Sequence, residues 1–324
     1  MTGREVRFGV ALKNFTPYPD EPSIDEIVTF TTRAEALGFE SAWVWDHILL
    51  GSKRPFPYLE SLATLTALAM KTQRLQLGTG VLVLPLRNPV VLAKVLTSLD
   101  HISKGRLILG VAAGWYEREF DACGVPFKER GKIFVRNLEV LKRFWTEDQV
   151  NGAANGYVFN RSVMLPKPLQ RPRPPILFGG YVDVVLRRLA RHGDGWLTYF
   201  YTPESFRRTW AKIRSLTEEA GRDPAALRNV SQLPIYVAPS FEEADRGVRD
   251  FIARYFDAAP WSESTADSSI RGTPDQCAEQ LAAHIAAGVE HIVLVPYDYR
   301  LDQLEVIGRE ILPNLRGRIA GVRA

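Results

Sequence analysis

The sequence predicts a (β/α)8 barrel, and two observations support this prediction. Short apolar runs alternate with amphipathic helical stretches along the whole chain, a pattern typical of parallel strands joined by crossover helices. Eight such runs occur, which is the strand number of this barrel, and a chain of 324 residues is compatible with one barrel domain over residues 1–324. The predicted strands are Val6 to Leu12, Ser41 to Trp45, Leu75 to Leu84, Arg106 to Ala112, Ile176 to Phe178, Gly195 to Tyr199, Ser231 to Ala238 and His291 to Pro296.

Residues that begin and end helices lie between these strands in the expected order. The first helix begins at the capping box Ser23-Ile24-Asp25-Glu26 and ends at Gly38, just before the second strand. A Thr-Pro start at Thr202-Pro203-Glu204 opens the helix that follows the sixth strand. The capping box Thr273-Pro274-Asp275-Gln276 and the stop at Gly288 bound the helix before the eighth strand.

Two stretches interrupt the alternation and are interpreted as insertions. Residues 146–175 contain a polar Gly/Asn segment, an expected strand pair through Tyr157-Val158-Phe159 and Val163-Met164-Leu165, and a proline-rich return. Residues 257–272 surround Trp261. Long loops at the C-terminal mouth of a barrel are commonly lids, so both insertions are expected there. For the second, a plain surface loop is an equal alternative.

Composition restricts the class of protein and of partner. The chain is 46% hydrophobic and 24% charged, which is ordinary for a globular protein. Its net charge of +4 is too small for a nucleic-acid surface, and no apolar run reaches the roughly 20 residues that span a bilayer. The first residues lack the basic-then-apolar pattern of a signal peptide, so no secretory signal is expected, and the spacing of the two cysteines predicts no disulfide scaffold. We expect a cytoplasmic protein that acts on a small molecule, without a nucleic-acid or membrane partner.

Several chemistries are excluded by missing motifs. The sequence has no H-E-x-x-H, G-x-S-x-G or G-x-x-x-x-G-K-[ST], which argues against a zinc protease, an esterase or a nucleoside triphosphatase. Gly78-Thr79-Gly80 lacks the third glycine of a dinucleotide fingerprint and falls on the third strand. The five histidines include no pair at metal-ligand spacing, so no metal site is expected.

Two polar groups at the C-terminal ends of strands are candidates for the active site, because catalytic residues of these barrels lie there. Asp46 and His47 directly follow the second strand, and a satisfied loop histidine is the alternative for His47. Gly179, Gly180 and Tyr181 lead into a helix whose free backbone N–H groups suit an anion such as a phosphate. A tight strand-to-helix turn is the equal alternative for this segment.

Four segments together resemble the luciferase-like family of flavin and deazaflavin (coenzyme F420) oxidoreductases. Their order, spacing and position relative to the strands all match this family. They are Ala42 to His47, Leu77 to Pro85 with Arg87-Asn88-Pro89, Gly105 to Trp115, and Pro175 to Gly180 with Gly193 to Trp196.

The resemblance implies a tricyclic ring across the barrel mouth, with its phosphate at Gly179, Gly180 and Tyr181. It also implies a bulge in the third strand with a cis peptide bond between Gly80 and Val81, pressed against the ring.

Further site residues follow from the same resemblance. Asp46 and His47 match the acidic-histidine pair that lies beside the reactive ring in the deazaflavin branch, and the resemblance implies that both are catalytic. His47 would stabilise charge or exchange a proton as the hydride moves, and Asp46 would also contact the cofactor. Ala113, Gly114 and Trp115 would line the pyrimidine side of the ring.

The resemblance implies an F420-dependent oxidoreductase, with a reduced-FMN monooxygenase as the alternative. Deazaflavin sugar-phosphate dehydrogenases of the family carry glutamates at the positions of Lys13 and Trp115, and their catalytic tryptophan is replaced by Gly51. These departures disfavour that substrate class, and they leave open a catalytically inactive barrel that acts as a binding subunit. Homodimerisation through the helices beside strands two and three is expected from the family.

Basic and aromatic side chains near the mouth suggest a site for an acidic cofactor tail and an aromatic substrate pocket. A polyglutamate tail on F420 would suit Lys53, Arg54 and Arg87, whose alternative is ordinary solvated loop charge. An aromatic substrate pocket, with plain packing as the alternative, could be built from Phe15, Trp115, Tyr199, Tyr201, Trp261, Tyr297 and Tyr299.

Overall fold

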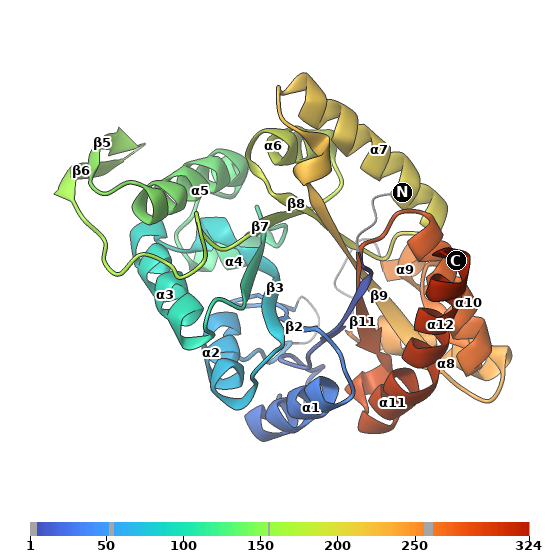
Figure 1. The fold of residues 1–324 in the computed structure, drawn as a ribbon. Helices are drawn as coiled ribbons and strands as arrows, with labels where there is room; N and C mark the ends of the chain where they lie inside the picture. Colours follow the sequence, from blue (N-terminus) through green and yellow to red (C-terminus); the bar gives the residue numbers. More distant parts are fainter. Residues whose placement is uncertain (1–4, 52–54, 155, 256–261, 324) are drawn as a thin grey trace.

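The computed structural model describes residues 5–51, 55–154, 156–255 and 262–323. In this part of the chain, eight parallel strands form a closed barrel with helices around it, as the sequence predicts (Figure 1). All eight predicted strands are confirmed, with ends that differ by up to three residues. They are β1 (Arg7–Ala11), β2 (Ser41–Val44), β3 (Gln76–Val83), β4 (Leu107–Ala112), β7 (Ile176–Gly179), β8 (Gly195–Tyr199), β9 (Arg228–Val237) and β11 (His291–Pro296).

The barrel closes through parallel pairing between sequence-distant strands. β1 pairs with β11, with Phe8 opposite Ile292, and β8 pairs with β9, with Leu197 opposite Val230. A short strand, β10 (Ile270–Gly272), adds to the outside of β9 near its C-terminal end.

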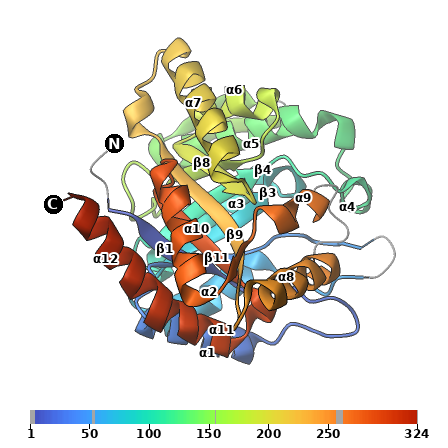
Figure 2. The same ribbon diagram turned by 90° about the vertical axis from the view of Figure 1, so that its right-hand side faces the viewer.

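The helices surround the barrel, as two perpendicular views show (Figures 1 and 2). The predicted helix starts are confirmed, because Ser23 and Thr202 accept backbone N–H groups at the N-termini of their helices and Thr273 forms a complete capping box with Gln276. The longer helices are α1 (Ile24–Ala36), α2 (Ser61–Lys71), α3 (Pro89–Ile102), α5 (Arg130–Thr146), α6 (Asp183–His192), α7 (Pro203–Glu219), α8 (Phe241–Tyr255), α10 (Pro274–Ala286) and α12 (Leu312–Arg323). The short ones are α4 (Glu117–Ala122), α9 (Ser262–Asp267), α11 (Leu301–Val306), the 3-10 turns η1 (Leu84–Leu86), η2 (Phe127–Glu129), η3 (Pro224–Ala226) and η4 (Tyr297–Tyr299), and the π turn η5 (Ile307–Ile311).

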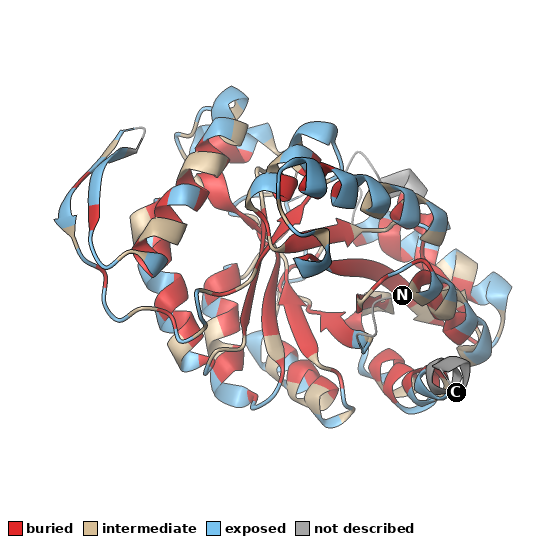
Figure 3. Ribbon diagram, turned by 45° about the horizontal axis from the view of Figure 1, so that its top comes forward, coloured by how far each residue is buried: buried red, intermediate tan, exposed pale blue. Residues whose placement is uncertain are grey.

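The strands are buried and the helices around them are exposed on their outer faces (Figure 3). Side chains of the strands pack against one another inside the barrel. Trp43 of β2 fills the barrel interior and is 1% exposed. It fits because Gly78 of the neighbouring β3 has no side chain, and a Cβ there would lie 2.2 Å from the Trp43 ring. The aromatic residues Trp45, Tyr58 and Tyr199 pack on the upper part of this interior cluster and cover the barrel at its C-terminal end.

The third strand carries the irregularity that the family resemblance predicts. The register between β3 and β4 shifts between Thr79 and Leu82, which marks a bulge, and the Gly80–Val81 peptide bond is cis. Val81 therefore projects at the C-terminal end of the barrel, next to the ends of β2 and β4.

The first insertion differs from its prediction in pairing and in place. Its hairpin joins β5 (Val150–Ala154) to β6 (Tyr157–Ser162), so residues 163–165 form no strand. In the sequence the two strands are separated by Asn155-Gly156, a dipeptide typical of hairpin turns. The hairpin follows the C-terminal end of α5 and protrudes from the body, where Lys167 donates to the carbonyls of Phe144 and Glu147 (Figure 1). It lies at the N-terminal end of the barrel, because a crossover helix runs antiparallel to the strands, and it is no lid.

The second predicted insertion contains α9 and β10, and β10 extends β9 close to the mouth. Its Trp261 lies outside the described residues. Over the described residues, no helix is long and apolar enough to cross a membrane, and no cluster of side chains could hold a metal ion.

Candidate active site

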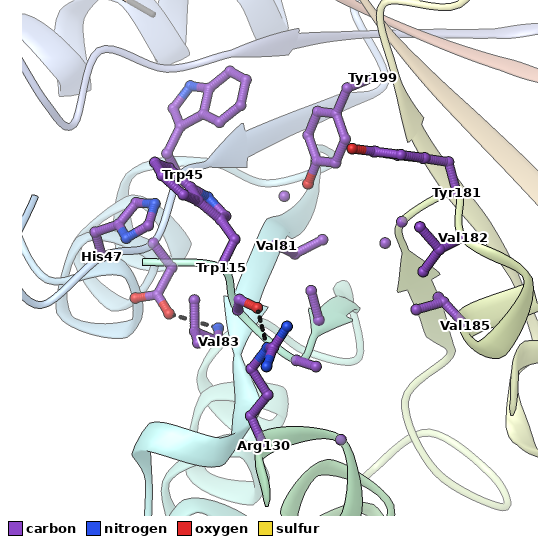
Figure 4. Close-up of a pocket in the computed structure, with 18 of the residues that line it drawn as sticks. Trp45, His47, Val81, Val83, Trp115, Arg130, Tyr181, Val182, Val185 and Tyr199 are labelled. Carbon is purple, nitrogen blue, oxygen red and sulfur yellow. Dashed lines mark hydrogen bonds between the residues drawn. The ribbon is translucent and has the colours of Figure 1, made fainter. Parts of the chain in front are cut away.

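One cavity of about 530 Å³ opens at the C-terminal end of the barrel. It is lined by residues of β3, β4, β7 and β8, of the loops that follow β1, β2, β4 and β7, and of the helices α5, α6 and α8. Figure 4 shows Trp45, His47 and Trp115 on one side of the cavity and Tyr181, Val182 and Val185 on the other. Every predicted site residue lies on its wall, namely Asp46, His47, Gly80, Val81, Ala113, Gly114, Trp115, Gly179, Gly180 and Tyr181. The roles predicted for these residues remain predictions.

The Asp46 carboxylate is fully occupied by neighbouring donors. Its Oδ1 accepts hydrogen bonds from Arg87 Nη2 at 2.7 Å and Ser61 Oγ at 2.9 Å, and its Oδ2 accepts from Arg87 Nη1 and the Val83 backbone N–H, both at 2.8 Å. Four bonds use the acceptor capacity of a carboxylate, and this side chain is 1% exposed. Asp46 therefore ties the end of β2 to the bulged end of β3, and this environment suits a positioning role better than proton transfer to a substrate.

His47 is oriented by a second carboxylate. Its Nδ1 lies 3.1 Å from Oε2 of Glu119 on α4, and the Glu119 side chain is 0% exposed. Glu119 Oε1 also accepts the backbone N–H groups of Ile48 and Leu49. The imidazole edge packs against the rings of Tyr58 and Trp115, with centroids 5.6 and 5.7 Å away. His47 is thus held in a fixed ring plane on the cavity wall, with its side chain 12% exposed.

Sequence reasoning missed Glu119 as a site residue. The signal available was weak: a glutamate next to Phe120 in a short helical stretch after the fourth strand. In the structure, Phe120 is 0% exposed and packs edge-on against Phe127, which turns the neighbouring Glu119 inward. A buried carboxylate needs donors, and the chain segment after His47 supplies them.

The glycines of the site allow close approach of backbone and side chains around the cis bond. A Cβ on Gly179 would lie 2.6 Å from Val81 Cγ1, and a Cβ on Gly114 would lie 2.7 Å from Val83 Cγ1. Gly114 and Gly180 also have φ values of +82° and +126°, which favour glycine. The result is a smooth wall around Val81, shaped to meet a flat molecule.

The far end of the cavity is basic and contains the start of α6. The backbone N–H groups at the beginning of this helix receive no side-chain cap from Val182. Lys128, Arg130 and Arg188 line the same end, and the Arg188 guanidinium packs against Gly131, where a Cβ would lie 2.6 Å from its Nη2. Positive charge and a helix N-terminus at one place favour an anionic group, such as a phosphate.

The opposite end is aromatic. Phe15 stacks on Tyr58 with centroids 4.9 Å apart, and Trp45 stacks on Tyr199 with centroids 6.0 Å apart. Burial raises the pKa of Tyr199 well above its usual range, and the described residues give its buried hydroxyl no hydrogen-bond partner. Of the predicted aromatic pocket, Phe15, Trp115 and Tyr199 line the cavity, whereas Tyr201, Tyr297 and Tyr299 do not.

Arg87, which was expected to suit the polyglutamate tail of F420, forms ion pairs within the protein instead. It is paired with Asp46 and with Glu60, and its side chain is 13% exposed. Burial alone would lower its pKa, but the two carboxylates outweigh this effect and raise it. Lys53 and Arg54 lie outside the described residues.

Comparison with known proteins is consistent with this geometry. The family model described as luciferase-like monooxygenase matches residues 6–291. The chain belongs to this family. It is 28% identical over 290 residues to the FMNH(2)-dependent dimethylsulfone monooxygenase of Pseudomonas putida, which covers 79% of this chain and 78% of that protein. It is 25% identical over 324 residues to the F420-dependent glucose-6-phosphate dehydrogenase of Amycolatopsis mediterranei, with coverage of 90% and 94%.

The fold is shared with solved luciferase-like proteins. The crystal structure of a monooxygenase from Streptomyces bottropensis superposes with a TM-score of 0.81 at 23% identity, covering 95% of this chain and 99% of that chain. Members of this luciferase-like family use either F420 or FMN, so family membership supports an oxidoreductase or monooxygenase and leaves both cofactors open.

Proposed function

We propose that this luciferase-like protein is an F420-dependent oxidoreductase that moves a hydride between the deazaflavin and a small organic substrate. The observation that carries the proposal is the shared cavity. It joins a fixed imidazole, His47, to Val81 at the bulge of β3 and to the basic end at α6. These are a proton-exchanging group, a flat support and an anion site, in the order that a phosphate-bearing ring cofactor requires.

The residues of the cavity fit such a cofactor. The bare backbone at Gly179 and Gly180 leaves room beside Val81 for a planar ring, since side chains there would collide with Val81 or strain the turn. Arg130, whose Nε donates to the Gly114 carbonyl, and Arg188 of α6 line the cavity together with the start of α6, where they would hold the phosphate. The unpartnered hydroxyl of Tyr199 at the aromatic end offers a hydrogen bond to a bound molecule.

The cavity residues would transfer the proton and exclude water during the reaction. A bound deazaflavin supplies a carbon that accepts or donates a hydride. His47 takes the proton that leaves a substrate oxygen as the hydride departs, and returns it in the reverse direction. Phe15, Tyr58 and Trp45 exclude water from the reacting carbon and hold an apolar substrate beside the ring.

Titration with both cofactors tests the proposal. Purified protein is titrated with F420 and with FMN, and each chromophore is followed by absorbance and fluorescence. We expect saturable binding of both, with F420 bound more tightly. Preference for reduced FMN, with oxygen consumption, would instead support a flavin monooxygenase. If the protein binds neither F420 nor FMN, the result would support a catalytically inactive barrel that acts as a binding subunit.

A further inference from the structure

Glu119 faces His47 in an arrangement that determines where the imidazole carries its proton. Oε1 of Glu119 accepts the Ile48 and Leu49 backbone N–H groups, so its other oxygen, Oε2, is the one that faces His47 Nδ1 at 3.1 Å. A carboxylate offers only acceptor sites. Nδ1 must therefore be the donor in this contact, and in the neutral ring the proton resides on Nδ1.

The other ring nitrogen of His47, Nε2, is available to a molecule bound in the cavity. His47 lines the cavity, and within the described part of the chain its only hydrogen bond is the one from Nδ1. Neutral imidazole carries one proton, so a proton on Nδ1 leaves Nε2 with a free lone pair. Nε2 is consequently a hydrogen-bond acceptor for a molecule bound beside His47 in the cavity.

We infer that Glu119 is a positioning residue that fixes the Nδ1–H tautomer of His47 and thereby makes Nε2 the proton acceptor of the site. The consequence for catalysis rests on the proposed function, whereas the tautomer is a property of the protein alone. A substrate with a hydroxyl group can donate to Nε2; its O–H proton passes to Nε2 while the hydride leaves the adjacent carbon for the cofactor, and a C=O bond forms. A substrate that offers only an acceptor finds no donor at Nε2 of the neutral ring.

Glu119→Gln is a sharp test because it is nearly isosteric. The Ile48 and Leu49 N–H groups still require an acceptor, so the amide oxygen takes the place of Oε1 and the amide NH2 faces His47. Nδ1 then becomes an acceptor, and the proton moves to Nε2. Glu117→Gln is the matched control, because it removes the same charge from an exposed position of the same helix.

The measurement is made on the cofactor-free protein. Histidine labelled with 15N is incorporated, and two-bond 1H–15N correlation spectra are recorded at mildly alkaline pH, where imidazoles are neutral. The His47 signals are identified by their loss in His47→Gln. We expect a protonated-type Nδ1 and an unprotonated-type Nε2 in the wild type and in Glu117→Gln, and the two types exchanged in Glu119→Gln.

Two outcomes would overturn the inference. One is an Nε2–H tautomer in the wild type, which needs no variant and therefore holds even if Glu119→Gln unfolds. The other is a folded Glu119→Gln protein with an unchanged tautomer. Failure to bind F420 or FMN would remove the proposed function and leave the tautomer assignment standing, so the two failures are distinguishable.

Discussion

The Arg87 guanidinium and the Asp46 carboxylate pair through two parallel hydrogen bonds of 2.8 and 2.7 Å, both side chains being nearly buried. The pair links the end of β2 to the segment that follows β3. Asp46 lies on the cavity wall next to His47, so the shape of the site depends on this contact.

Removal of Arg87 is expected to destabilise the protein and the site together. Arg87→Ala leaves the Asp46 charge buried and unpaired, which costs about 3 to 5 kcal/mol in comparable pairs. Urea unfolding measures the loss, and Arg87→Lys should restore only part of it, because an ammonium lacks the planar fork. Arg309→Ala is the control, since its i,i+4 pair with Glu305 is exposed and worth less than about 1 kcal/mol. Equal effects of Arg87→Ala and Arg309→Ala would contradict the structure.

The wall at Gly179 is expected to control cofactor binding. Gly179→Ala places a methyl group 2.6 Å from Val81 Cγ1, which forces Val81 toward the cavity. We expect the affinity for F420 and FMN to fall by about tenfold, roughly 1.4 kcal/mol, with a smaller effect on stability. Gly317→Ala, on a helix with open space around the new methyl, should leave binding unchanged. Unchanged binding in Gly179→Ala would show that no ring lies against Val81.

The basic end of the cavity is expected to distinguish FMN from riboflavin. Arg188→Ala should weaken FMN binding by roughly 10- to 100-fold, on the order of two charge-assisted hydrogen bonds, and leave riboflavin binding nearly unchanged. Isothermal calorimetry with both ligands gives the comparison. Arg187→Ala, a neighbouring and exposed arginine on α6, is the control. A parallel loss for both ligands would place the phosphate elsewhere.

Stability is expected to fall with acid because of a buried histidine. Burial, together with the charge of Arg7, lowers the pKa of His291 from 6.5 to about 3, and its Nε2 lies 2.7 Å from Ser41 Oγ. Below pH 6.5 His291 is protonated in the unfolded chain but stays neutral in the folded protein. Its contribution to the free energy of unfolding is therefore fully present above pH 6.5 and is lost as the pH falls toward 3.

Urea unfolding across this acidic range tests the sign. The slope of the free energy of unfolding against pH should be smaller in His291→Asn by up to about 1.4 kcal/mol per pH unit. His101→Asn, at a half-buried position whose ring nitrogen pairs with the Lys167 carbonyl, serves for comparison. An identical slope in wild type and His291→Asn would mean that His291 is protonated in the folded state.

We also propose a homodimer through the face of α2 and α3. Met70, Val91 and Val95 are 69%, 62% and 41% exposed on these helices, and Val91 and Val95 lie one turn apart on α3. Neighbouring exposed apolar side chains would suit an interface between two copies of the chain. Val91→Lys should convert the dimer to a monomer in light scattering, and Leu301→Lys on α11 should not. A wild-type monomer at working concentration would contradict this proposal.

The local pattern of residues determined most of the fold. Apolar runs fixed the eight strands, and Ser23, Thr202 and Thr273 fixed where helices begin, because caps and hydrophobic faces act over a few neighbouring residues. The predicted pairing of residues 157–159 with residues 163–165 is wrong, because β6 pairs with β5, on the other side of the Asn155-Gly156 dipeptide in the sequence.

Only the tertiary structure determined which distant residues contact the side chains of the site. Sequence order brings Asp46 and His47 together, but only barrel closure and the path of α4 place Glu119, 72 residues later, against the imidazole. The same is true of Arg87, whose loop position looks solvated in the sequence and is buried in the fold. Hydrogen bonds between distant groups leave no periodic trace in a single chain, so the partners of His47 and Asp46 became visible only once the strands were assembled.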